Sequence, residues 1–79
     1  MSAYAKRIAT RTGTDDQATI ALIEELMRAE RPALDDLTPA EFDAAIIGAL
    51  ADAQDLHDAG QLAAWCAAYG LAVPAAVAG

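Results

Sequence analysis

Large apolar side chains return every three or four residues along most of the chain, and no segment of useful length alternates between apolar and polar residues. At ~100° per residue, this spacing gathers the side chains on one side of a helix. We therefore predict an all-α protein with a small three-helix core and room for a short fourth helix at the N-terminus. The three stripes are Ile20, Ile23, Leu26 and Met27; Phe42, Ala45, Ile46, Ala49, Leu50, Ala53, Leu56 and His57; and Leu62, Trp65, Cys66 and Tyr69.

Capping motifs indicate where two of these helices begin. The segment Thr14–Gln17 has the spacing of a capping box, in which two side chains bond each other's backbone N–H groups. A helix from there should run to about Arg31, because Pro32 disfavours helical geometry in the residue before it. The segment Thr38–Glu41 repeats the motif with proline at the first helical position, where a missing N–H costs nothing. We expect this second helix to run to about Asp58.

The third helix cannot continue straight from the second. In one unbroken helix, the stripe around Ile46 and the stripe around Trp65 would point about 170° apart, and a single core could not receive both. A glycine can adopt the left-handed conformation that ends many helices. We therefore predict a break at Ala59–Gly60, followed by a last helix from Gln61 to Tyr69 that ends at Gly70.

The chain is short and poor in large apolar residues. It has 79 residues, and alanine accounts for 22 of them. By surface scaling, a fold of this size buries only about 60% of the surface of its extended chain. We expect a single helical domain over residues 1–79. Within it, residues 1–12 should form a basic arm or a short helix, and residues 72–79 a frayed tail.

Charge is unevenly distributed. The net charge is −7, and all five Lys and Arg lie within the first 31 residues. The acidic C-terminal half should repel phosphate groups, so we expect no useful affinity for nucleic acid. There is no apolar run near the ~20 residues that span a membrane, and no secretory signal. The sequence therefore predicts a cytoplasmic protein without a membrane partner.

The residues that usually carry catalysis or bind metals are scarce. The chain has one serine (Ser2), one histidine (His57) and one cysteine (Cys66). No usual metal ligand lies three or four residues from His57, the spacing at which ligands meet on a helix. Cys66 lies on an apolar stripe, which favours a small buried side chain over a reactive thiol. We expect a protein that is not an enzyme, with no catalytic residues, no bound metal and no cofactor.

Some large side chains fall outside the predicted core faces, and others are too large for so short a chain to bury completely. Ile47 lies about 120° from the centre of its helix's apolar face, and Leu22 is displaced in the same way. Large rings on a short helix are typical of interfaces. We therefore predict a small acidic interaction or regulatory module that binds a protein partner, which could be a second copy in a homodimer. The residues expected to form this surface are Leu22, Ile47, Trp65 and Tyr69.

A second hypothesis uses the acidic side of the helix that begins near Pro39. Its carboxylates could dock on a basic partner, as an acidic inhibitor or a nucleic-acid mimic would. The residues of this stripe are Glu41, Asp52, Asp55 and Asp58. A third hypothesis, a weak DNA-binding regulator, would rely on the basic N-terminal residues Lys6, Arg7 and Arg11.

Overall fold

A computed structural model describes residues 3–31 and 33–75 of the chain. The described residues are helical, as predicted, and contain no strand. The short N-terminal helix is also confirmed. The elements are α1 (Ala3–Thr12), α2 (Gln17–Glu30), a short 3-10 helix η1 (Leu34–Asp36), α3 (Pro39–Asp58) and α4 (Leu62–Ala68).

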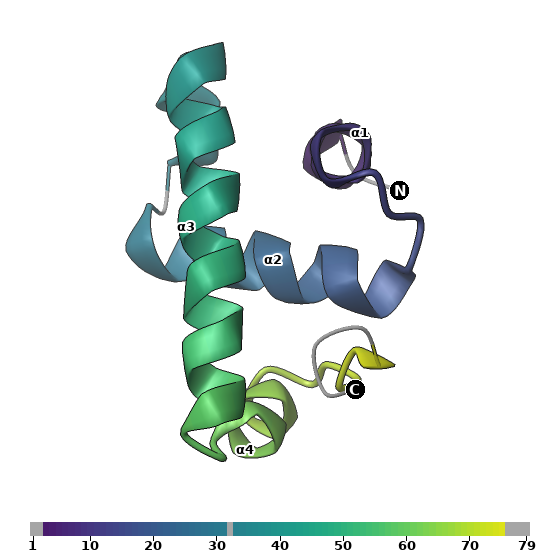
Figure 1. Ribbon diagram of the computed structural model, residues 1–79. Helices are drawn as coiled ribbons and strands as arrows, with labels where there is room; N and C mark the ends of the chain where they lie inside the picture. The colour runs from purple at the N-terminus through teal and green to yellow at the C-terminus, as the bar shows by residue number, and fades with distance from the viewer. Residues whose placement is uncertain (1–2, 32, 76–79) are drawn as a thin grey trace.

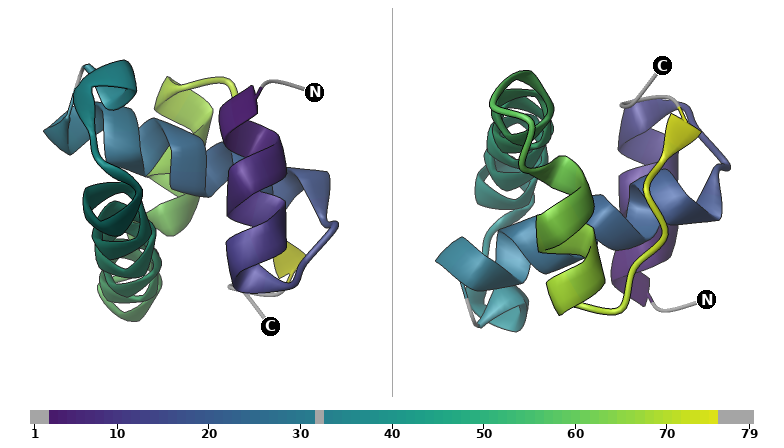
Figure 2. Two further views of the ribbon diagram at one scale, coloured as in Figure 1. Left: turned by 90° about the horizontal axis from the view of Figure 1, so that it is seen from above. Right: turned by 90° about the horizontal axis from the view of Figure 1, so that it is seen from below.

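The longest helix, α3, crosses α2, and the other two helices pack around this pair (Figure 1). Views from above and below place α1 and α4 on opposite sides of α2 (Figure 2). The two ends of α3 therefore have different neighbours. Its first half lies on the side of α1, and its last turns lead into α4.

The core is filled by side chains from every helix. Ile8 of α1 is fully buried, although only three helices were expected to build the core. Burying a side chain of this size stabilises a fold by about 1.5–3 kcal/mol, so α1 is part of the fold and not a free arm. The buried apolar residues are Ile8, Ile20, Leu22, Ile23, Leu26, Met27, Leu34, Phe42, Ala45, Ile46, Ala49, Ala53, Leu62 and Cys66.

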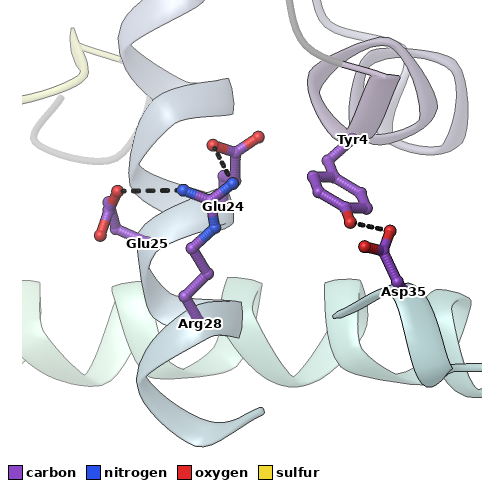
Figure 3. Close-up of polar contacts among 5 residues, drawn as sticks. All are labelled: Tyr4, Glu24, Glu25, Arg28 and Asp35. Carbon is purple, nitrogen blue, oxygen red and sulfur yellow. Dashed lines mark hydrogen bonds and ion pairs between the residues drawn. The ribbon is translucent and has the colours of Figure 1, made fainter. Parts of the chain in front are cut away.

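Aromatic and polar contacts hold α1 against residues that are distant from it in the sequence. The Tyr4 hydroxyl donates a hydrogen bond to the Asp35 carboxylate of η1 (Figure 3). The Tyr4 ring stacks on Phe42 of α3 at 6.0 Å between centroids, and the Arg7 guanidinium lies 3.9 Å from the Phe42 ring centre. These contacts set the position of α1 beside the first turns of α3.

The start of α2 differs from the prediction. The helix begins at Gln17, and its N-cap is Asp16, whose carboxylate accepts from the Thr19 N–H at 3.3 Å and the Thr19 hydroxyl at 2.6 Å. Thr14 lies before the helix and accepts from the Asp16 N–H at 3.2 Å. A carboxylate with two donors from one residue satisfies the helix end better than the threonine hydroxyl would.

The predicted start and end of α3 are confirmed. The Glu41 N–H donates to the Thr38 hydroxyl at 3.2 Å, and the Thr38 N–H donates to the Glu41 carboxylate at 2.9 Å, which completes the capping box. These hydrogen bonds lower the pKa of Glu41, because they favour its ionised form. At the other end, Gly60 has φ of 70°, and the helix breaks there as predicted.

The C-terminal segment is packed more closely than predicted. A frayed tail was expected from residue 72, yet Pro74 is among the most buried side chains of the chain. Residues 76–79 of that prediction lie outside the described residues. The chain thus returns along the core after Gly70, where φ of 68° allows the backbone to leave α4.

Candidate functional site

A hollow with an acidic rim opens where α2, α3 and α4 converge. It encloses about 400 Å³, within the usual range for ligand pockets. We call it the acidic groove. Its lining residues are Leu26, Ala29 and Glu30 of α2; Asp52, Asp55 and Leu56 of α3; Ala59 and Gln61 of the turn; and Trp65 of α4.

The groove forms because the break at Gly60 folds α4 back toward the end of α2. This turn brings Trp65 next to Leu26 and Leu56 along an apolar floor. Leu26 is buried, whereas Leu56 and Trp65 are half-buried and keep part of their surface open to a partner. The floor is therefore apolar and accessible, which is a common property of sites that recognise side chains.

Carboxylates from two helices meet on the rim. Asp52 raises the pKa of Glu30, first through a hydrogen bond that protonated Glu30 shares with it and second through charge repulsion. The neighbouring Arg31 lies 3.2 Å from the Glu30 carboxylate and has the opposite, smaller effect. Arg31 therefore offsets only part of the effect of Asp52 on Glu30.

Two aromatic rings stand at one end of the groove. The rings of Trp65 and Tyr69 stack with 4.2 Å between their centroids, and Tyr69 is half exposed. Tyr69 stacks on one face of the indole, and the same groove is lined by carboxylates. An indole ring and carboxylates both attract cations. The groove can therefore hold a flat cation such as a guanidinium against Trp65 while the carboxylates accept its hydrogen bonds.

The structure brings together some residues of the two predicted surfaces. Asp52 and Asp55 of the acidic stripe line the groove together with Trp65 of the predicted apolar patch. The stripe's other two carboxylates have separate local roles. Glu41 caps α3, and Asp58 accepts a hydrogen bond from the Gln54 amide at 3.0 Å.

The predicted patch of Leu22, Ile47, Trp65 and Tyr69 does not form one surface. Leu22 is fully buried in the core. At ~100° per residue it lies about 40° around α2 from Leu26, on the side of α2 that also lines the groove. Ile47 is exposed, at 54% of its surface, as predicted. However, at ~100° per residue it lies about 180° around α3 from Leu56, and so faces away from the groove.

Cys66 is buried as expected, and His57 lies at the end of α3. His57 is half-buried in the last turn of α3, where its carbonyl accepts the Gly60 N–H at 3.0 Å. Cys66 is fully buried, and burial raises the pKa of its thiol, which disfavours the reactive thiolate. Over residues 3–31 and 33–75, no three His, Cys, Asp or Glu side chains gather as metal ligands would.

Glu30 is the residue of the groove that sequence reasoning missed. It lies at the end of α2, far along the chain from Asp52, and its place beside that carboxylate depends on how α2 crosses α3. The one signal in the sequence is Pro32, which ends α2 close to Glu30. That signal places Glu30 in the last turn of a helix but does not show which residues of other helices lie near it.

The comparisons with known proteins identify no family. The chain matches no protein-family model, no curated protein sequence and no solved structure. None of the helices in the described part of the chain has both the length and the apolar character that crossing a bilayer requires. The site's own chemistry is therefore the basis for a functional proposal.

Proposed function

We propose that this chain is a non-enzymatic protein-interaction module. Its acidic groove binds a segment of a partner protein in which a cationic side chain is flanked by apolar side chains. The observation that carries the proposal is that Glu30, Asp52 and the half-buried Trp65 line the same groove, where Asp52 raises the pKa of Glu30. A cation bound beside two ionised carboxylates reduces the repulsion between them.

The groove favours arginine over lysine as the cation. A guanidinium is planar, is more weakly hydrated than an ammonium and presents several N–H donors in a fixed fork. It can therefore stack on Trp65 and donate to two carboxylates at once. The pair of Glu30 with Arg31 does not prevent this, because both side chains are about half exposed and such surface pairs contribute roughly 0–1 kcal/mol.

This proposal joins the two leading hypotheses from the sequence. The interaction surface is apolar at its floor, as the first hypothesis requires, and acidic at its rim, as the hypothesis of an inhibitor or nucleic-acid mimic requires. A mimic would need a row of free carboxylates along α3. Glu41 caps its own helix at one end of that row, and this favours a compact cation site over a long charged strip.

The chain contains one tryptophan, so its fluorescence reports on the groove directly. We would titrate the protein with a short helical peptide of alanine, leucine and arginine, and with the same peptide carrying citrulline in place of arginine. Citrulline keeps the shape of arginine but lacks its charge. We expect a saturable change in Trp65 emission with the arginine peptide and little or none with the citrulline peptide.

A variant with a charge-neutralised groove tests the site, and a variant changed outside the groove is its control. The variant Glu30→Gln with Asp52→Asn should bind the arginine peptide at least about tenfold more weakly, equivalent to ~1.4 kcal/mol. The variant Asp15→Asn with Asp36→Asn makes the same change in net charge at exposed positions outside the groove and should bind like the wild type. Equal binding of the arginine and citrulline peptides, or no binding of either into the millimolar range, would refute a cation site.

A further inference from the structure

A second, basic surface lies on the α1 side of the molecule. Its hollow encloses about 610 Å³ and is lined by Lys6, Arg7, Thr10 and Arg11 of α1 and by Asp43 of α3. We call it the basic face. Arg11 lies 3.7 Å from Asp43, but both side chains are about half exposed, so this pair is weak. Three cations therefore face one acid, and the surface attracts anions.

Exposed apolar side chains continue the basic face along α3. Ile47 lies one helical turn beyond Asp43, on the side of α3 that meets α1, and Leu50 follows on the same side. Their exposed fractions are 54% and 39%, which is high for large aliphatic residues. The basic face thus combines cations with apolar surface, the chemistry that the acidic groove complements.

The two complementary surfaces lie at opposite sides of the molecule. The basic face involves α1 and the first half of α3, whereas the acidic groove involves the second half of α2, the last turns of α3, and α4. Since α1 and α4 lie on opposite sides of α2, one copy cannot bring its own two surfaces together (Figures 1 and 2). A second copy carries a surface that complements each of them in both charge and apolar character.

We propose that the basic face of one copy docks in the acidic groove of another, in a head-to-tail arrangement. This inference rests on the proposed function of the groove as a cation-binding site and names a second copy as its partner. The contact is heterologous, so each docked copy still presents one free surface of each kind. Association therefore extends to short chains as the concentration rises and does not stop at a symmetric dimer.

The dependence of association on salt concentration distinguishes this contact from an apolar dimer. The net charge of −7 makes copies repel at long range, but the contact itself pairs opposite charges. At ~0.15 M salt the screening length is about 8 Å, which removes most of the long-range repulsion and leaves close pairs in place. At ~1 M salt the length falls to about 3 Å, and head-to-tail association weakens. An apolar dimer would instead strengthen with salt.

The test uses sedimentation velocity on two charge-reversal variants of the full chain. Lys6→Glu with Arg11→Glu reverses the basic face, and Asp52→Lys with Asp55→Lys reverses the groove rim. We expect wild-type association at ~0.15 M salt, and at least about tenfold weaker association for each variant alone, equivalent to ~1.4 kcal/mol. An equimolar mixture should associate again, because each reversed surface meets an opposite charge on the other variant. Circular dichroism checks that both variants keep their helices.

A matched control separates the docking contact from net charge. Asp15→Lys with Asp36→Lys makes the same change in net charge as the groove variant, at exposed positions outside both surfaces. It should associate at least as well as the wild type. A wild-type mass near 8.2 kDa at all concentrations, or variants that associate like the wild type, overturns the proposal. Binding of the arginine peptide by a monomeric wild type would leave the cation site standing and remove only the head-to-tail contact.

Discussion

Asp52, in the second half of α3, raises the pKa of Glu30, the last residue of α2. Protonated Glu30 can share a hydrogen bond with Asp52, whereas the two ionised carboxylates repel each other. We predict that Asp52→Asn lowers the pKa of Glu30 toward its ordinary value. A side-chain carboxyl NMR titration measures this directly. Asp55→Asn is the control and should leave the Glu30 titration nearly unchanged, since Asp55 does not contribute to the shift.

The same pair affects stability with a definite sign. The pKa of Glu30 is raised in the folded state, so folding binds a proton between the ordinary and the raised pKa. The contribution of Glu30 is most favourable below the ordinary pKa and is lost as pH rises through the raised one. Urea denaturation across this range should show the loss in the wild type and a flatter profile in Asp52→Asn.

The N-cap of α2 gives a third prediction. Asp16 accepts from both donors of Thr19, so Asp16→Ala should destabilise the fold by about 1 kcal/mol. Thr14→Ala should have a smaller effect, because Thr14 accepts one hydrogen bond at an exposed position before the helix. Urea denaturation compares the two variants. A larger loss for Thr14→Ala would mean that the capping box expected from the sequence forms in solution.

Two glycines should respond in opposite directions to the same substitution. Gly60 has φ of 70°, so Gly60→Ala should destabilise the fold by roughly 1–2 kcal/mol. Gly48 lies inside α3, and a Cβ there would meet nothing within 4 Å. Gly48→Ala should therefore stabilise the fold by about 0.5–1 kcal/mol. Thermal melts followed by circular dichroism measure both changes.

Duplex DNA should not bind with useful affinity despite the basic face. The cations of α1 are few, and the net charge of −7 opposes the release of counterions that drives such binding. Fluorescence anisotropy at ~50 mM salt, a permissive condition for such binding, should stay flat into the high micromolar range. A saturating curve that Lys6→Glu abolishes would instead favour the DNA-binding hypothesis.

The sequence predicted the helices well where one local signal was dominant. The capping box at Thr38–Glu41 and the turn at Gly60 involve no competing residue, and both are confirmed. The start of α2 was wrong by a few residues because Thr14 and Asp16 are both good N-caps. The choice between them depends on the Thr19 hydroxyl, whose contribution the capping-box pattern does not include.

The site was less predictable because it depends on contacts between helices. Asp52 and Asp55 could be placed on one side of α3 from their spacing, but their meeting with Glu30 and Trp65 requires the crossing of α2 over α3. The error at Leu22 has the same origin. A helical wheel shows that Leu22 leaves the main stripe, but not that the rest of the fold covers it there.

The anchoring of α1 has a consequence for any ligand of its cations. Ile8 is fully buried, and Tyr4 is bonded to Asp35 and stacked on Phe42, so Lys6 and Arg11 are carried on a helix that is already folded. A disordered basic tail loses conformational entropy when it binds, and that loss weakens its affinity. Here the backbone entropy is lost when the protein folds, and only side-chain freedom remains to be restricted on docking.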